Sequence, residues 1–103
     1  MFRVTDGGIT APKGFKAAGK HIGIKKVKKD IALVTSDVPA EAAGVYTTNI
    51  VKAAPLLWNE KITKAGKKIR GIAAISGNAN ACTGTQGIRD NELMAKTFAD
   101  CLG

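Results

Sequence analysis

The feature that most constrains the fold is a short apolar run that passes directly into a polar loop. Apart from Arg70, residues 69–75 are apolar with small side chains and predict a central β-strand packed closely against its neighbours. Residues 76–87, which follow, are rich in Gly, Asn, Ser and Thr and predict a loop. Because binding and catalytic groups concentrate in loops at strand ends, we expect function to concentrate here.

Two stretches have the three-to-four-residue apolar period of an amphipathic helix. Residues 53–65 carry Pro55, which suits a first helical turn, and are followed by Gly66, which suits the left-handed end of a helix. From about Thr85 the apolar residues again recur at helical spacing, as far as Leu102. The sequence therefore predicts one helix before the polar loop and one after it.

Three earlier segments predict β-structure. Small and apolar residues alternate with lysines over residues 16–27, which indicates the solvated face and turn of a β-hairpin. Residues 31–34 form a continuous apolar run that Ser36 helps to end, and they predict a strand buried on both faces. After an Ala-rich helical or turn segment at 39–43, the β-branched run at 45–50 predicts another strand.

The predicted order is strand, strand, strand, helix, strand, helix. It gives an α/β (α+β) fold with a mixed sheet and flanking helices. No internal repeat, low-complexity tract or interdomain linker divides the sequence. We therefore expect residues 1–103 to form a single domain or part of one.

The positive charge is clustered, and the net charge is +8. Residues 13–29 hold seven lysines and no acidic residue, and a second group follows at 61–70. Basic runs raise the question of nucleic acid. However, the first run has a single aromatic residue, Phe15, and no arginine or known binding module. We therefore expect a solvated strand face and no nucleic-acid partner.

The composition excludes several classes of protein. With 45% hydrophobic residues the chain is not a disordered tail, and no stretch is long and apolar enough to span a membrane. The first residues lack a signal peptide's order of basic and then apolar residues, so we expect a cytoplasmic protein. Cys82 and Cys101 lack metal-site spacing and predict two partly buried free thiols. Five aromatic residues make a lean core, so independent stability is not assured.

Few residues outside the polar loop carry chemistry. The single histidine, His21, lies in the predicted lysine-rich strand and lacks the partners of a catalytic triad. The carboxylates are scattered, and no acid/base pair is visible. The glycines at 77, 84 and 87 match neither the dinucleotide-binding pattern nor the P-loop.

Within the loop, the substrate-pocket candidates are Asn78, Asn80, Thr83 and Gly84. Their amides, hydroxyl and backbone N–H groups could orient a small polar substrate or stabilise an oxyanion. The same residues also suit turns, and Thr83 or Thr85 could cap the following helix. A threonine nucleophile would require an activating base or a free α-amino group, and none is evident here.

Five segments resemble the ornithine acetyltransferase family, also called the bifunctional glutamate N-acetyltransferases of arginine biosynthesis. They follow the family's order along nearly the whole chain. These segments are TAPKGFKAAG (10–19), KDIALVTSDVPA (29–40), AGVYTTN (43–49), VKAAP (51–55) and SGNANACTG (76–84).

The resemblance implies a precursor that cleaves itself before a threonine, which becomes the nucleophile at the start of a β chain. That threonine carries acetyl from N-acetylornithine to glutamate by a ping-pong route. Members that use acetyl-CoA also make N-acetylglutamate. The family implies a cytoplasmic heterotetramer of α and β chains, with no metal and no organic cofactor.

Two of the family's catalytic motifs are absent from these residues: the Ala-Thr cleavage motif and the Ser-Thr-Gly-Val-Ile-Gly type segment that supplies the oxyanion-hole Thr-Gly. Thr83 and Gly84 belong to a different signature and are not assigned that role. Ile75 stands where the family commonly has Asn, which puts a polar role for that position in doubt. We therefore expect this chain to be the opening part of the α chain, inactive and poorly stable alone, with the catalytic residues lying outside it.

Two alternatives follow from the same residues. The +8 charge favours a free-standing basic module that binds an anionic ligand or a protein partner. An aminopeptidase of the related self-processing hydrolases would use the same kind of nucleophile, exposed by self-cleavage. The close matches of the five segments favour the acetyltransferase instead.

Overall fold

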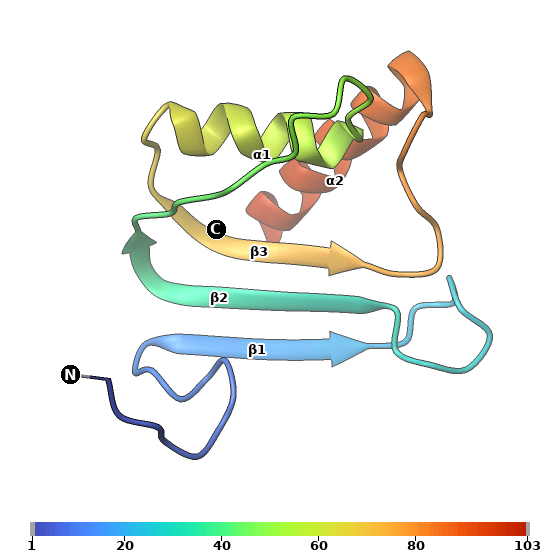
Figure 1. Cartoon of the computed structure of the whole chain (residues 1–103). Helices are drawn as coiled ribbons and strands as arrows, with labels where there is room; N and C mark the ends of the chain where they lie inside the picture. Colours follow the sequence, from blue (N-terminus) through green and yellow to red (C-terminus); the bar gives the residue numbers. More distant parts are fainter. Residues whose placement is uncertain (1, 103) are drawn as a thin grey trace. The chain divides into compact units, whose positions relative to one another are not determined.

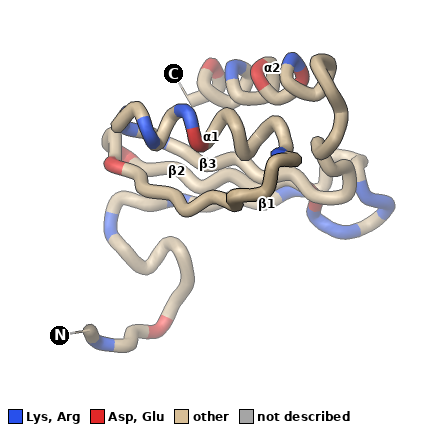
Figure 2. The backbone as a smooth tube through the Cα atoms, turned by 45° about the horizontal axis from the view of Figure 1, so that its top comes forward, with Lys and Arg blue, Asp and Glu red and all other residues tan. Residues whose placement is uncertain are grey.

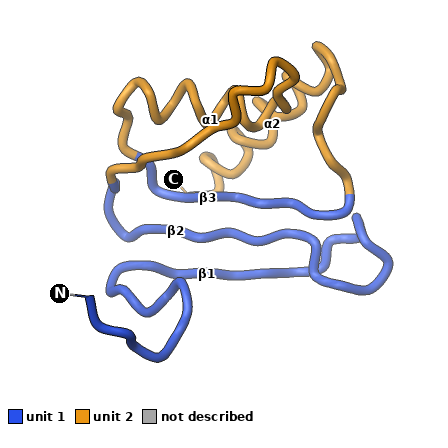
Figure 3. Tube along the Cα trace, viewed as in Figure 1, with its two compact units in different colours: residues 1–40, 69–77 blue, residues 41–68, 78–103 orange. Residues whose placement is uncertain are grey.

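A computed structural model describes residues 2–102 and contains three strands and two helices (Figure 1). The elements are β1 (Phe15–Lys20), β2 (Ile31–Ala40), α1 (Ala54–Lys64), β3 (Ile69–Ile75) and α2 (Gly84–Leu102). They fall into two compact units (Figure 3). The first unit holds the residues up to Ala40 together with Ile69–Gly77, and the second holds Glu41–Lys68 together with the residues from Asn78 onward.

The first unit is a three-stranded sheet in the order β1-β2-β3. Both pairings are antiparallel, with Lys20 opposite Ile31 and Ile31 opposite Ile75. The predicted α+β class is confirmed, as is the hairpin that β1 and β2 form. The expected mixed sheet is wrong, because both pairings among the described strands are antiparallel. The strand expected at 45–50 does not form, and β3 pairs directly with β2. For the same reason β2 takes the central place that was expected for residues 69–75.

The central strand is longer than its apolar run. It continues past Ser36 to Ala40, although Ser36 was expected to help end it. Its pairing with β3 is irregular between Thr35 and Ala40, and a bulge of this kind tolerates Pro39, which has no N–H to donate. The Arg70 side chain donates from Nε to the Ser36 carbonyl oxygen at 3.5 Å and so supplies a partner where the ladder is interrupted.

The connection between β1 and β2 is wrapped around one carboxylate. Asp30 is only 2% exposed, and its two oxygens accept hydrogen bonds from the backbone N–H groups of Ile22 (2.8 Å), Ile24 (2.7 Å) and Lys25 (3.0 Å). His21 lies in this connection, so its expected place within a strand is wrong. Its Nε2 donates to the Lys25 carbonyl oxygen at 2.6 Å, 3.9 Å from an Asp30 oxygen.

Two opposing effects set the pKa of Asp30. Burial alone raises the pKa, but the three N–H donors and the nearby His21 outweigh that effect and hold the pKa below its ordinary value of 3.8. The negative charge is therefore the form that the folded loop favours.

The second unit contains α1 and α2, which contact each other. Helix α1 confirms the predicted helix: a proline stands in its first turn, Ala65 caps it, and Gly66 follows in the left-handed conformation with φ of 67°. Helix α2 confirms the second predicted helix. Because it begins at Gly84, the expected loop at 76–87 is four residues shorter and ends at Thr83.

The segment between β2 and α1 has no regular secondary structure. The strand expected at 45–50 is therefore wrong, as is a helical turn over 39–43, where Pro39 and Ala40 belong to β2. β-branched residues favour a strand only where another strand supplies hydrogen bonds and packing. Within residues 2–102 no strand pairs with this segment.

The described residues lack an apolar core, because no hydrophobic side chain among them is buried. The expectation that residues 31–34 are buried on both faces is wrong, since they are half-buried or exposed. Both cysteines are free, as expected, but both are exposed rather than partly buried.

Replacing Asp30 with Asn removes the charge and one acceptor oxygen, so we expect the amides of Ile22, Ile24 and Lys25 to lose their hydrogen-bonded chemical shifts. Because the folded pKa is depressed, the carboxylate's contribution is present above pH 3.8 and is lost as the pH falls through the lower folded value. NMR spectra from neutral to strongly acidic pH measure both effects.

The matched control is Asp37→Asn, which removes an exposed carboxylate 3.6 Å from Lys16 and should leave these amides unchanged. Equal effects of the two substitutions would contradict the role assigned to Asp30.

The missing core predicts that the isolated chain unfolds gradually on heating, because cooperative unfolding depends on a buried apolar core. Circular dichroism at several protein concentrations measures this. A sharp transition that is independent of concentration would show that the chain is stable by itself.

Candidate functional site

The loop that leads into α2 is held by a side-chain cluster in the second unit. Asn80 donates from Nδ2 to the Gly87 carbonyl oxygen at 2.7 Å, and its Oδ1 accepts a short hydrogen bond from the Thr83 hydroxyl. These two bonds join the loop to the first turn of the helix. We call Asn80, Thr83 and Gly87 the loop clamp.

Thr83 occupies the N-cap position of α2. Its carbonyl oxygen accepts from the Gly87 N–H at 3.3 Å, which is the first hydrogen bond of the helix. Gly87 is buried, and a Cβ there would collide with the side chains of Thr83 and Asn80. Glycine at 87 is therefore a condition for the loop clamp to close.

The clamp divides the predicted pocket residues into two kinds. Asn80 and Thr83 already use their side chains on each other and on the helix, which favours the structural interpretation of these two residues. Asn78 is exposed, and no hydrogen bond joins its side chain to another residue of the described chain. Gly84 is exposed as well, with φ of 63°, a conformation that suits glycine.

The start of α2 offers a second set of donors. In an α-helix the first N–H groups have no partner within the helix, here those of Gly84, Thr85 and Gln86. Such groups, together with the positive end of the helix dipole, favour a carboxylate or another anion. With the exposed amide of Asn78, they are the groups of this loop that can contact a polar substrate.

The loop also contains a strained residue. Cys82 has φ of 56°, a left-handed conformation that costs a residue with a side chain about 1–2 kcal/mol. Strain of this kind clusters at functional sites, where the surrounding structure maintains it. Here it turns the chain between Asn80 and the N-cap.

No other cluster in the described residues competes with this loop. His21 braces the β1–β2 connection in the first unit, and the carboxylate beside it, that of Asp30, is occupied by three backbone N–H groups. Within residues 2–102, no three His, Cys, Asp or Glu side chains gather to hold a metal ion. None of the helices described there is long and apolar enough to cross a bilayer.

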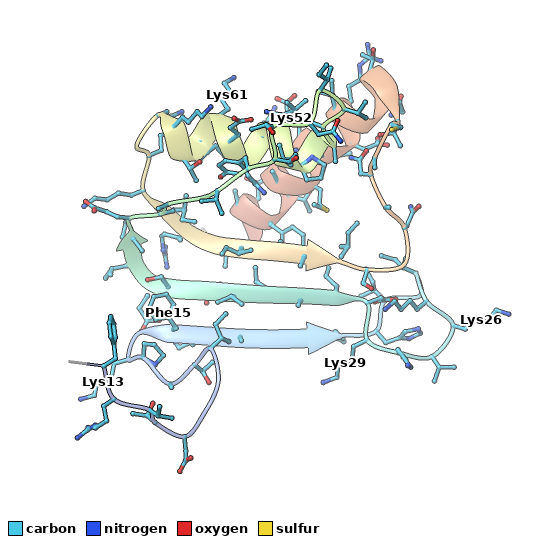
Figure 4. All side chains as sticks on the ribbon, in the orientation of Figure 1. Lys13, Phe15, Lys26, Lys29, Lys52 and Lys61 are labelled. Atoms are coloured by element: carbon cyan, nitrogen blue, oxygen red, sulfur yellow. The ribbon has the colours of Figure 1, made fainter. Side chains whose placement is uncertain are left out.

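The lysines of the first run mostly lie on β1 and on the connection to β2 (Figure 2). Lys26 and Lys29 mark that connection in Figure 4. Lys26, Lys28 and Lys29 are exposed, as expected for a solvated surface. The second group includes Lys64, which forms an ion pair with Glu60 of α1. Lys52, outside that group, pairs with the same carboxylate, and the two ammonium groups lower the pKa of Glu60.

Two anchoring contacts were not predicted from the sequence. Asp30 was counted only among the scattered carboxylates, although a lone acid at the end of a lysine run is a detectable signal. The hydrogen bond between Tyr46 and Thr63, at 2.7 Å, joins residues far apart in the sequence and leaves no local pattern.

Comparison with known proteins places the chain among relatives of one kind. A family model described as the ArgJ family matches residues 16–103. A protein of Symbiobacterium thermophilum named arginine biosynthesis bifunctional protein ArgJ is 54% identical over 94% of this chain, and one of Bacillus anthracis with the same name is 49% identical over 98%. The chain spans about a quarter of the length of each of these curated relatives.

Solved structures agree with the sequence matches. The arginine biosynthesis bifunctional protein argJ of Bacillus halodurans is 41% identical, with a TM-score of 0.83 over 90% of this chain and 51% of its own. An ornithine acetyltransferase of Mycobacterium tuberculosis, complexed with ornithine, is 48% identical, with a TM-score of 0.80 over 85% of this chain and 46% of its own.

The loop clamp predicts that Asn80→Ala destabilises the start of α2. The substitution removes two hydrogen bonds, each worth about 1 kcal/mol, so the amides of the first helical turns should exchange with solvent faster. Asn78→Ala is the matched control in the same loop, because its side chain is exposed. If both substitutions change exchange equally, the clamp does not hold the helix.

Proposed function

Because this chain belongs to the ArgJ family, we propose that it is the first part of the α chain of an ornithine acetyltransferase that moves acetyl from N-acetylornithine to glutamate. The observation that carries the proposal is the match to the family model over residues 16–103, together with 54% identity to a protein named for arginine biosynthesis. Because the chain spans only a quarter of its relatives, it contributes a segment of that enzyme and is inactive alone.

The solved relatives support the substrate class. The Mycobacterium tuberculosis protein is called an ornithine acetyltransferase and was crystallised with ornithine. The relatives named bifunctional support a second reaction, in which acetyl-CoA supplies the acetyl group and N-acetylglutamate is made. Neither reaction draws on a metal or an organic cofactor in this proposal.

The lengths of the relatives support processing into two chains. This chain covers about a quarter of the curated relatives but about half of the chains in the solved structures. The crystallised polypeptides are therefore roughly half as long as the curated sequences. A precursor that cleaves itself into an α and a β chain accounts for this difference, and the new N-terminal threonine of the β chain would be the nucleophile.

Within the assembled enzyme, we assign the polar loop to the wall of the substrate pocket. Asn78 and the N–H groups that begin α2 are free to bind a substrate carboxylate or amide. Asn80 and Thr83 act through the loop clamp, which sets the position of those groups. The nucleophilic threonine and the oxyanion Thr-Gly come from outside these residues.

We place the enzyme in the cytoplasm as a heterotetramer of α and β chains, without nucleic acid or membrane as a partner. The second candidate function is a basic module for an anionic ligand, which the exposed lysines of the β1–β2 connection favour. Binding to nucleic acid that weakens steeply with salt would support that candidate.

A chimera tests the proposed function. In it this chain replaces the matching segment of the Symbiobacterium thermophilum relative. We expect the chimera to transfer acetyl from N-acetylornithine to glutamate, and the isolated chain to transfer none, because it lacks the nucleophile. An inactive chimera beside an active parent, or turnover by the isolated chain, would contradict the proposal.

The same chimera tests the pocket. Asn78→Ala should raise KM about tenfold, the effect of losing one substrate hydrogen bond of about 1.4 kcal/mol, without lowering thermal stability. The control is Asn59→Ala, at an exposed asparagine of α1. An unchanged KM in Asn78→Ala would remove that residue from the pocket wall.

A further inference from the structure

The segment at residues 45–50 exposes apolar side chains without forming a strand. Val45 is 100% exposed and Ile50 is 97% exposed, and residues 42–51 carry no charge. The composition, rich in β-branched residues, is typical of a strand. We call residues 45–50 the free segment.

The backbone of the free segment is also largely unpaired. Within the described chain, the hydrogen bond of its backbone is a local one, from the Asn49 N–H to the Thr47 hydroxyl oxygen. Just past the segment, the Val51 N–H donates to the Asn49 side chain. No backbone hydrogen bond joins the segment to another element of residues 2–102. Its N–H and C=O groups are therefore available to a second extended chain.

Two contacts hold the free segment in place on α1. The Tyr46 hydroxyl and the Thr63 hydroxyl are 2.7 Å apart, and Lys52, just past the segment and labelled in Figure 4, lies 3.3 Å from Glu60. Gly44 allows the first contact, because a Cβ there would collide with the Tyr46 ring. Anchoring near both ends lowers the entropy that is lost when a partner pairs with the segment.

The free segment differs from the exposed edge of the sheet. Strand β1 is fully exposed but carries Lys16 and Lys20, which discourage pairing with another strand. The free segment has no such charge. If the free segment stayed unpaired in the finished protein, it would be a site for aggregation.

We propose that the free segment is a docking strand for an extended apolar segment that lies outside these 103 residues, in the longer enzyme to which this chain would belong. The inference rests on the proposed function, in which this chain is part of a longer enzyme. The curated relatives are about four times as long as this chain, so an enzyme of this family has ample further polypeptide from which such an occupant can come. A second copy of this chain is a poorer occupant, because two chains of charge +8 repel each other.

Hydrogen exchange in the isolated chain and in the chimera tests the docking strand. We expect the amides of residues 45–50 to exchange freely in the isolated chain and at least about tenfold more slowly in the chimera. Val45→Lys in the chimera should restore fast exchange and lower the thermal midpoint, because it places a charge in the docked interface. Val45→Thr keeps the β-branched shape and should retain the protection.

The matched control is Val4→Lys. Val4 is 99% exposed and precedes the residues that the family model matches, so the substitution should change neither exchange nor the thermal midpoint.

The outcomes separate this inference from the proposed function. Free exchange of 45–50 in an active chimera overturns the docking strand and leaves the acetyltransferase standing, whereas protection in an inactive chimera supports the docking strand and overturns the acetyltransferase. Slow exchange already in the dilute isolated chain would show that the chain covers the segment itself. Slow exchange that appears only at high concentration would assign the segment to a second copy. Either of these last two results overturns the inference.

Discussion

One residue, Asp30, joins all three strands of the sheet. Its N–H donates to the Lys20 carbonyl oxygen at the end of β1, and its carbonyl oxygen accepts from the Ser76 N–H just after β3, at 2.9 Å. Its carboxylate meanwhile collects three N–H groups from the β1–β2 connection. Because each of these polar groups is paired, Asp30 can be buried although no apolar side chain of residues 2–102 is. The sheet is therefore fixed at one end by polar contacts.

The second unit is fixed by side-chain contacts of the same local kind. Asn80 ties the loop to α2, and Tyr46 and Lys52 tie the irregular segment to α1. Hydrogen bonds define these positions but contribute little net stability, since each replaces a bond to water. The apolar surface that would supply stability is exposed, as at Val45 and Ile72. A chain with well-defined polar anchors and exposed apolar faces is consistent with one segment of a larger protein.

The sequence predicted the elements whose signals are local. Helix α1 carries its proline at the start and Gly66 at the end, and β3 is a compact apolar run between turn residues. The strand expected at 45–50 failed because a strand depends on a partner that the sequence of the segment does not specify. The loop was correctly singled out as polar, but the sequence could not distinguish Asn78 from Asn80. Their side chains are chemically identical, and they differ in their surroundings: Asn80 bonds to the Gly87 carbonyl oxygen and to the Thr83 hydroxyl, whereas Asn78 is exposed.

The distribution of lysine distinguishes two kinds of exposed surface. Where the chain has lysine, on β1 and the β1–β2 connection, exposure matches a surface that faces water, because an ammonium group is costly to bury. Residues 45–50 are mostly exposed, rich in β-branched side chains and uncharged. Burying these side chains therefore requires no charge to be desolvated, and their backbone N–H and C=O groups can still form hydrogen bonds. The net charge of +8 is therefore no guide to a nucleic-acid partner in itself. It marks faces that stay in solvent, whereas the uncharged segment at residues 45–50 is the one at which the proposed docking would bury apolar surface.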